Sequence, residues 1–314
     1  MVLYMIMYMI SFYLVMGGDD WFLVWLGLEV NMMMFIIIIY QRYSMMNIES
    51  CMKYFFIQSM GSAIFMGMFY IGWGYLELVL CFMLSYKVGA GPFFFWFPSV
   101  CEGISWMSCL LLMSFQKLIP LMLIGFFLTW VVFVIGMMSM VFGVLGSFNQ
   151  SNLKRLIAYS SVFHLGMLFL CMMIESIYWV NYLIMYVLLI FPVIVFVSYL
   201  NMMSLLSMKK LKSNMWFIIL MMSMSGMPPF LGFFLKWFVF MSVVKLSVIF
   251  GLFLVVFSVI MFYVYFRIVY DMLLGSMMMS SWVNWMMESY SYQMDLISVL
   301  GVFLGVFLGV FLVF

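Results

Sequence analysis

Charged residues are scarce in this chain. Of its 314 residues only 7% are Asp, Glu, Lys or Arg, whereas 69% are hydrophobic. Soluble globular domains carry about 25% charged residues, so a soluble fold of this length is excluded. The solvent for most of the chain must be lipid, and length therefore predicts membrane spans rather than soluble domains.

The chain also has few residues that bind metals or form disulfides. It contains one histidine, and its five cysteines include no C-x-x-C pair. No metal site can be assembled from such spacing, and the cysteines are expected to act as small buried hydrophobes. Gly89-Ala90-Gly91 is followed by Pro92 and preceded by no predicted strand, so it is not a nucleotide-binding loop. We expect this chain to bind no metal and no cofactor.

Positive charge is too sparse for a nucleic-acid partner. The formal net charge is +2, and only Lys209, Lys210 and Lys212 form a cluster. Such a cluster beside apolar segments is typical of a loop that faces anionic lipid headgroups. We therefore expect contacts with membrane lipids and none with nucleic acid.

Long hydrophobic runs dominate what is present. A helix crosses a bilayer with about 20 apolar residues, and these runs are too continuous for the alternating pattern of a β-barrel. The chain is predicted to be an all-α polytopic membrane protein with about 11 transmembrane helices. The predicted spans are 1–16, 21–40, 54–71, 76–98, 104–126, 129–147, 153–174, 177–200, 215–244, 246–270 and 296–314.

Basic residues in the loops predict the orientation of the chain. If successive loops alternate sides, one side receives Lys245 alone and the N-terminal side receives eight basic residues. These eight are Arg42, Lys53, Lys154, Arg155, Lys209, Lys210, Lys212 and Arg267. Short loops rich in Lys and Arg stay inside, so the N-terminus is expected on the positive-inside face and Phe314 on the opposite one.

Two adjacent prolines interrupt the ninth predicted span. Pro228 and Pro229 remove two backbone donors, so the helix must break there. Irregular backbone at membrane depth persists only where protein or trapped water satisfies it. Lys236 follows about two turns after the break, at 1.5 Å rise per residue. A lysine in this setting predicts a functional site, and the alternative is a side chain that extends to the membrane interface.

Five ionisable residues lie inside predicted spans: Glu29, Lys87, Lys117, His164 and Lys236. Taken singly, a buried carboxylate can be inert and a histidine can be a packing residue. Together they indicate proton transfer, because an amine in low dielectric releases its proton more readily and a nearby carboxylate opposes that release. The prolines beside the lysines are expected to leave backbone carbonyls free to hold water, which proton hopping requires.

The order of these residues repeats along the chain. Lys87 lies on the fourth predicted span beside a Gly/Pro break, and Lys236 lies on the ninth. Glu29 on the second span and His164 on the seventh are also five spans apart. An offset of five spans inverts the second half in the membrane, which is the inverted-repeat plan of secondary transporters.

The predicted organisation is therefore a single membrane domain over residues 1–314. Its parts are a first five-helix repeat at 1–126, a second at 127–270, and an interfacial segment with a final helix at 271–314.

Several short motifs together resemble the chain 2 family of mitochondrial NADH:ubiquinone oxidoreductase, respiratory complex I. They are Leu26-Gly27-Leu28-Glu29-Val30-Asn31, Lys53-Tyr54-Phe55, Lys87-Val88-Gly89-Ala90-Gly91-Pro92-Phe93, Trp96-Phe97-Pro98, Gln116-Lys117-Leu118-Ile119-Pro120, Ala158-Tyr159-Ser160-Ser161 with His164, and Gly226-Met227-Pro228-Pro229-Phe230-Leu231-Gly232-Phe233 with Lys236-Trp237. The match runs in order from about Leu26 to Trp237. Two positions differ, since family members often have His at Phe94 and Glu at Ser99.

The resemblance implies an antiporter-like, proton-pumping subunit whose fold has two inverted five-helix repeats with discontinuous helices and a shortened N-terminus. By motif, Glu29 and Lys87 correspond to the family's carboxylate–lysine pair and Lys117 to its central lysine. His164 corresponds to the connecting histidine, and Lys236 to the lysine of the second broken helix. The five residues are thereby expected to move protons.

The resemblance also implies a setting. The chain would be a subunit of the proton-translocating NADH:ubiquinone reductase in the mitochondrial inner membrane, with its N-terminus on the matrix side and its C-terminus on the intermembrane-space side. NADH, FMN, iron–sulfur clusters and ubiquinone would be used by other subunits. Neighbouring partners would be chains 4 and 4L and accessory subunits.

Two alternatives remain at this stage. A free-standing cation/proton antiporter would use the same lysines and broken helices. A structural spacer that has lost pumping would explain the departures at Phe94 and Ser99 but not the retained ionisable residues, because apolar replacements would ease membrane insertion.

Overall fold

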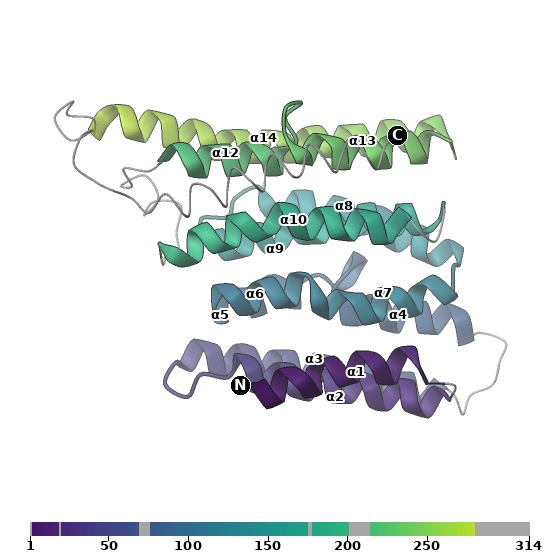
Figure 1. Cartoon of the computed structure of the whole chain (residues 1–314). Helices are drawn as coiled ribbons and strands as arrows, with labels where there is room; N and C mark the ends of the chain where they lie inside the picture. The colour runs from purple at the N-terminus through teal and green to yellow at the C-terminus, as the bar shows by residue number, and fades with distance from the viewer. Residues whose placement is uncertain are drawn as a thin grey trace. The chain divides into compact units, whose positions relative to one another are not determined.

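The elements in the described part of the chain are all helices, as predicted (Figure 1). The computed structural model describes residues 2–18, 20–68, 76–174, 178–200, 214–245 and 247–279. By contacts between helices, the chain divides into two compact units. The first comprises Met1–Phe142 with Ser161–Phe169, and the second comprises the described residues of Gly143–Ser160 and Leu170–Phe314.

The first unit is built around α3, which packs against α2, α4 and α5. Helix α4 also packs against α7. The helices of the first unit are α1 (Val2–Met16), α2 (Trp21–Ile39), α3 (Met45–Met68), α4 (Leu76–Val88), the short 3-10 helix η2 (Gly91–Phe93), α5 (Trp96–Gly103), α6 (Trp106–Met113), α7 (Phe115–Phe126) and most of α8 (Trp130–Ser147). Helix α9 (Leu153–Met172) is shared between the units.

The second unit contains two helices that run in sequence on either side of the double proline. These are α12 (Asn214–Ser225) and α13 (Leu231–Val244), and both pack against α10 (Tyr178–Tyr199) and α14 (Val248–Met279). The predicted break at Pro228 and Pro229 is therefore confirmed.

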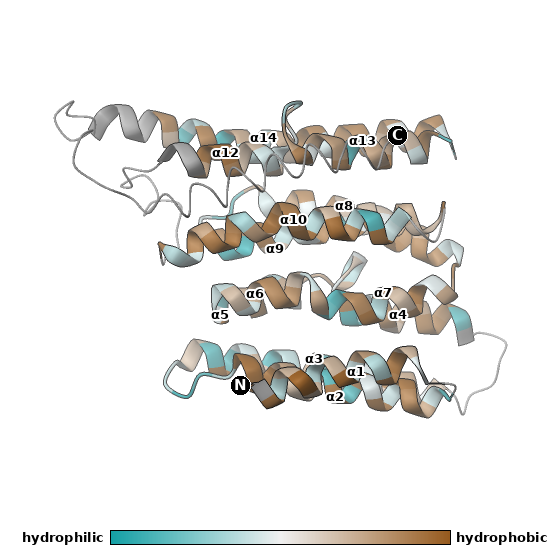
Figure 2. Ribbon diagram, in the orientation of Figure 1, coloured by the Kyte–Doolittle hydropathy of each residue, from teal (hydrophilic) through white to brown (hydrophobic). Residues whose placement is uncertain are grey.

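Six described helices or helix pairs are long and apolar enough to cross a membrane. A further candidate is the pair Glu77–Phe93 and Trp96–Gly103, which is bent by 93°. Hydrophobic residues dominate α2, α10 and α13 in Figure 2, as expected for helices in lipid. The predicted span 296–314 lies outside the described residues, so the count of about 11 and the inverted repeats stay predictions.

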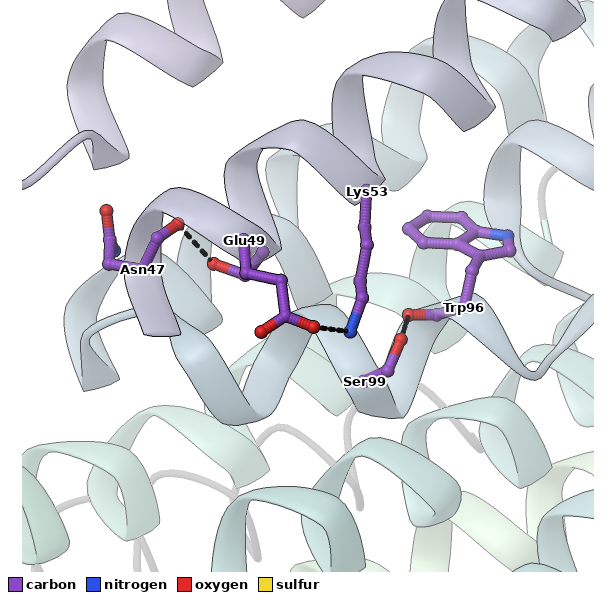
Figure 3. Close-up of polar contacts among 6 residues, drawn as sticks. Asn47, Glu49, Lys53, Trp96 and Ser99 are labelled. Carbon is purple, nitrogen blue, oxygen red and sulfur yellow. Dashed lines mark hydrogen bonds and ion pairs between the residues drawn. The ribbon is translucent and has the colours of Figure 1, made fainter. Parts of the chain in front are cut away.

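The third span begins earlier than its predicted start at residue 54. Helix α3 starts at Met45 and includes Lys53, which the loop-based orientation count had placed outside a helix. Lys53 pairs with Glu49 one turn earlier at 2.6 Å, and Figure 3 shows these two side chains pointing toward each other. Such an i, i+4 ion pair stabilises an exposed helical turn. Polar residues that precede an apolar run can therefore belong to the helix rather than to a loop.

Candidate functional site

Helix α4 ends at the predicted break with a Schellman motif. Gly89 has φ +76°, and its amide bonds to the carbonyls of Ser85 and Tyr86 at 3.0 and 3.2 Å. The amide of Ala90 also bonds to Ser85 O at 3.0 Å. The left-handed residue that this motif needs is most often glycine. The chain then turns through η2 into α5, which leaves Lys87 at the very end of α4.

A valine at Gly89 is expected to destabilise this end of α4 by about 1–3 kcal/mol, because a β-branched residue is strained at positive φ. The added Cβ would also lie 3.2 Å from the Trp96 ring. Thermal unfolding of the purified assembly measures the effect. Gly67→Val is the matched control, since a Cβ there meets nothing within 4 Å. Equal stability of the two variants would contradict this account of the break.

Side chains satisfy the last carbonyls of α4. Trp96 Nε1 donates to Tyr86 O at 3.2 Å, and Gln58 Nε2 donates to Lys87 O at 2.9 Å. Protein side chains therefore donate to two of the carbonyls at this break, and the expectation that carbonyls freed by the prolines hold water stays a prediction. Protein side chains donate to these carbonyls because a carbonyl without a donor at membrane depth costs free energy.

Lys87 is brought beside Glu29. Only 6% of the Lys87 residue surface is exposed, and its aliphatic stem lies against Gly61, where an added Cβ would be 3.0 Å from Lys87 Cγ. The Glu29 carboxylate accepts a hydrogen bond from Ser62 Oγ and interacts electrostatically with the Lys87 amine. Among the described residues no ion pair joins the two side chains, so their charges interact over a longer distance.

Lys117 is the more deeply buried amine of the first unit, with 3% of its surface exposed. It lies on α7, one turn before Pro120. Its Nζ is 4.9 Å from the centre of the Phe97 ring and donates to Ser161 O at 3.4 Å. The ring face and the carbonyl both favour the protonated amine, which offsets part of the cost of burying it.

A small cavity joins the two lysines. Its volume, measured as the space that the centre of a water molecule can occupy, is about 20 Å³. A volume above about 10–15 Å³ on this measure can hold a water molecule. The lining residues are Leu28, Asn31, Met32, Tyr54, Gln58, Lys87, Val88, Trp96, Phe97, Leu112, Gln116, Lys117 and Pro120. Lys87 and Lys117 therefore line the same small cavity, and their role in proton transfer stays a prediction.

Uncharged polar side chains complete the cavity wall, and sequence reasoning did not assign them a role. Tyr54 Oη donates to Gln116 Oε1 at 3.2 Å, and Gln116 Nε2 donates to Asn31 Oδ1 at 3.1 Å. Gln58 also lines the cavity while it caps α4. Amide side chains within apolar runs were the available signal, because such groups are buried in a membrane only when they find partners.

His164 is buried in the first unit, on the part of α9 that belongs to it, with 3% of its surface exposed. Its ring meets that of Phe163 edge to face at 5.6 Å. It is not among the residues that line the cavity.

Lys236 lies in the second unit, and its amine hydrogen-bonds to the end of the helix that precedes the second break. Its Nζ donates to Ser225 O, the last residue of α12, at 2.5 Å. Gly226 follows with φ +85°, and its amide and that of Met227 bond to Ser223 O and Met222 O at 3.3 and 3.4 Å, another Schellman motif. Both breaks therefore end in the same way, but Lys87 precedes its break whereas Lys236 reaches back from the next helix.

Apolar or local contacts occupy the two positions that depart from the family pattern. Phe94 stacks on Phe142 with ring centres 4.9 Å apart. Ser99 Oγ donates to Trp96 O on its own helix at 2.8 Å, as Figure 3 shows. Neither side chain adds an ionisable group to the cavity.

The arrangement can hold and release protons. It offers buried amines, one carboxylate and space for water, and the described residues contain no group of three His, Cys, Asp or Glu side chains that could hold a metal ion. Amines and carboxylates exchange protons readily when a water molecule or a direct contact joins them.

Residues 71–261 match the model of the family described as NADH:quinone oxidoreductase/Mrp antiporter, TM. NADH-ubiquinone oxidoreductase chain 2 of Anopheles gambiae is 33% identical to this chain, covering 96% of it and 95% of the relative. The chain 2 protein of Artemia franciscana is 35% identical over 84% of this chain and 87% of its own.

Solved structures share the fold. A chain of respiratory complex I from Thermus thermophilus is 21% identical, covers 98% of this chain with 76% of its own length, and superposes with a TM-score of 0.78. A chain of the Mrp complex from Dietzia sp. is 16% identical, covers 79% of this chain with 56% of its own, and gives a TM-score of 0.65. Both similarities support the antiporter-like membrane fold.

Proposed function

Because this chain belongs to the NADH-ubiquinone oxidoreductase chain 2 family, we propose that its buried ionisable residues carry the protons that the family's enzyme moves. The chain is a proton-translocating membrane subunit of complex I and a multi-pass mitochondrial membrane protein. The residues proposed to transfer protons are Glu29, Lys87, Lys117, His164 and Lys236.

The cavity between Lys87 and Lys117 is the observation that carries this proposal. Lys87 and Lys117 both line one space large enough for water, and the Glu29 carboxylate interacts electrostatically with Lys87. A change in charge at Glu29 alters how firmly Lys87 holds its proton, and Lys87 can pass that proton toward Lys117. A tenfold change in proton affinity corresponds to about 1.4 kcal/mol, so modest rearrangements suffice.

The second unit takes part through Lys236. Its amine is held at the broken end of α12, where a change in the α12–α13 break would change its hydrogen-bond partner. We assign His164, on the helix shared by the two units, as the residue that follows Lys117 in the order of transfer.

The redox chemistry belongs to other subunits in this proposal. NADH, FMN, iron–sulfur clusters and ubiquinone act there, and this chain converts the resulting charge movement into proton transfer. Its partners are other complex I subunits, and we propose chains 4 and 4L as the neighbours. The proposed location is the mitochondrial inner membrane, with the N-terminus in the matrix, which rests on the distribution of loop Lys and Arg.

Glu29→Gln tests the proposal. The amide keeps the shape and can still accept from Ser62 Oγ, but it removes the charge that acts on Lys87. Proton translocation per NADH oxidised, measured in sealed vesicles that contain the assembled complex, is expected to fall about tenfold or more.

Glu49→Gln is the control, because Glu49 is exposed and pairs only with Lys53 on the surface of α3. Normal translocation in Glu29→Gln, with the complex fully assembled, would remove Glu29 from the mechanism.

A free-standing cation/proton antiporter is the second candidate, favoured by the Mrp-type family model and fold similarity. The size of the detergent-extracted particle separates the two functions. A complex I subunit migrates within a very large assembly, whereas a free antiporter migrates as this chain alone or with copies of itself.

A further inference from the structure

A chain of three uncharged side chains crosses the cavity wall between the lysines. Tyr54 Oη donates to Gln116 Oε1, and Gln116 Nε2 donates to Asn31 Oδ1, at 3.2 and 3.1 Å. The three residues come from α3, α7 and α2, and all three line the cavity with Lys87 and Lys117. We refer to Tyr54, Gln116 and Asn31 as the amide chain.

The amide chain cannot itself carry protons through the membrane. Carboxamides neither gain nor lose a proton near neutral pH, so Gln116 and Asn31 can only donate and accept hydrogen bonds. Three polar side chains from three helices are nonetheless held in a costly environment, and they meet at the one described cavity that both lysines share.

We propose that the amide chain positions a water molecule through which Lys87 and Lys117 exchange a proton. This inference rests on the function proposed above and adds three positioning residues to it. The ligand of the site is a single water molecule, which matches a cavity of about 20 Å³.

The direction of the hydrogen bonds explains how the water is oriented. The Tyr54 hydroxyl occupies Gln116 Oε1, which fixes the Gln116 amide so that its nitrogen donates toward Asn31. A carboxamide nitrogen has two N–H groups, so Gln116 and Asn31 retain donors for the cavity that they line. A water whose oxygen accepts from one of these donors keeps its second lone pair for the Lys87 ammonium, and its hydrogens are free to meet the lone pair of the neutral Lys117 amine.

The backbone adds an acceptor at the same place. Pro120 has no N–H, and the carbonyl four residues earlier in an α-helix, here that of Gln116, therefore lacks its usual donor. Pro120 and Gln116 both line the cavity. A protonated lysine or the water can donate to this carbonyl while the proton moves.

The proton balance is simple. The Lys87 ammonium donates one proton to the oxygen of the water, and the same water donates one of its own protons to the neutral Lys117 amine. Lys87 ends neutral, Lys117 ends protonated, and the water is regenerated. No oxidant, reductant or second reactant is needed.

Gln116→Met and Tyr54→Phe test the proposal in the assembled complex. Methionine keeps the length of glutamine without its amide, and phenylalanine keeps the ring that meets Phe35 and Trp96 at 5.1 and 6.1 Å. We expect the rate of proton translocation to fall about tenfold in Gln116→Met, which loses two hydrogen bonds, and about threefold in Tyr54→Phe, which loses one. Tyr43→Phe, at a residue that is 95% exposed, is the matched control.

The solvent deuterium isotope effect on translocation separates positioning from packing. If the amide chain orients the water, proton transfer across the cavity becomes slower than the other steps, and the isotope effect rises in both variants. A lower rate with an unchanged isotope effect would overturn the proposal in favour of a packing role. An unchanged rate and an unchanged isotope effect would overturn it as well.

A parallel Lys117→Met variant keeps this inference separate from the proposed function. If Lys117→Met loses translocation while Gln116→Met and Tyr54→Phe retain it, the amide chain is not needed and the lysine path stands. If Lys117→Met also translocates normally, the proposed function itself fails.

Discussion

Replacing Lys117 by methionine is expected to lower proton translocation by about a hundredfold or more while the complex still assembles. Lys117 is the amine that shares the cavity with Lys87, and methionine fills similar space without accepting a proton. Exchanging a buried charge for an apolar group of similar volume is often neutral or stabilising, so loss of the assembly is not expected.

Protons moved per NADH oxidised in sealed vesicles measure this effect, together with electron transfer from NADH to an acceptor that does not require pumping. Lys53→Met is the control, because the Lys53 side chain is 46% exposed and pairs with Glu49 on the surface. Assembled Lys117→Met complex that pumps at the normal ratio would show that the cavity is not on the proton path.

The features that local chemistry imposes could be predicted from the sequence. A charged residue within an apolar run stands out because it opposes insertion of that segment into the membrane. This property identified Lys87, Lys117 and Lys236 without any knowledge of their contacts. The helix breaks were equally visible, because Gly89 and Pro228 act on the backbone at their own positions.

The cavity wall could not be predicted in the same way. Asn31, Gln58 and Gln116 are uncharged, and their role depends on which helices meet rather than on their own sequence neighbours. The contact between Gln58 and Lys87 O spans 29 positions along the chain, and no periodicity indicates it. For the same reason the side chains from α3 and α5 that donate to the last carbonyls of α4 could not be predicted.

Lys236→Met is expected to reduce proton translocation by about a hundredfold as well, but with a larger loss of stability than Lys117→Met. The Lys236 amine donates to Ser225 O at 2.5 Å and so caps the broken end of α12. Losing that donor leaves a carbonyl unpaired at membrane depth, which costs about 1–3 kcal/mol and lowers the thermal stability of the assembly.

Lys236→Arg separates the two roles of this amine. A guanidinium can still donate to the Ser225 carbonyl, but its pKa is too high for it to release a proton at any physiological pH. If Lys236 only caps α12, arginine restores both stability and translocation. If Lys236 releases protons, arginine restores stability toward that of the unmodified chain and leaves translocation as low as methionine does. Lys245→Met, at the exposed end of α13, is the control for removing a lysine from this segment. The second outcome is the one we expect, because a cap alone does not require a group that can exist in both protonation states.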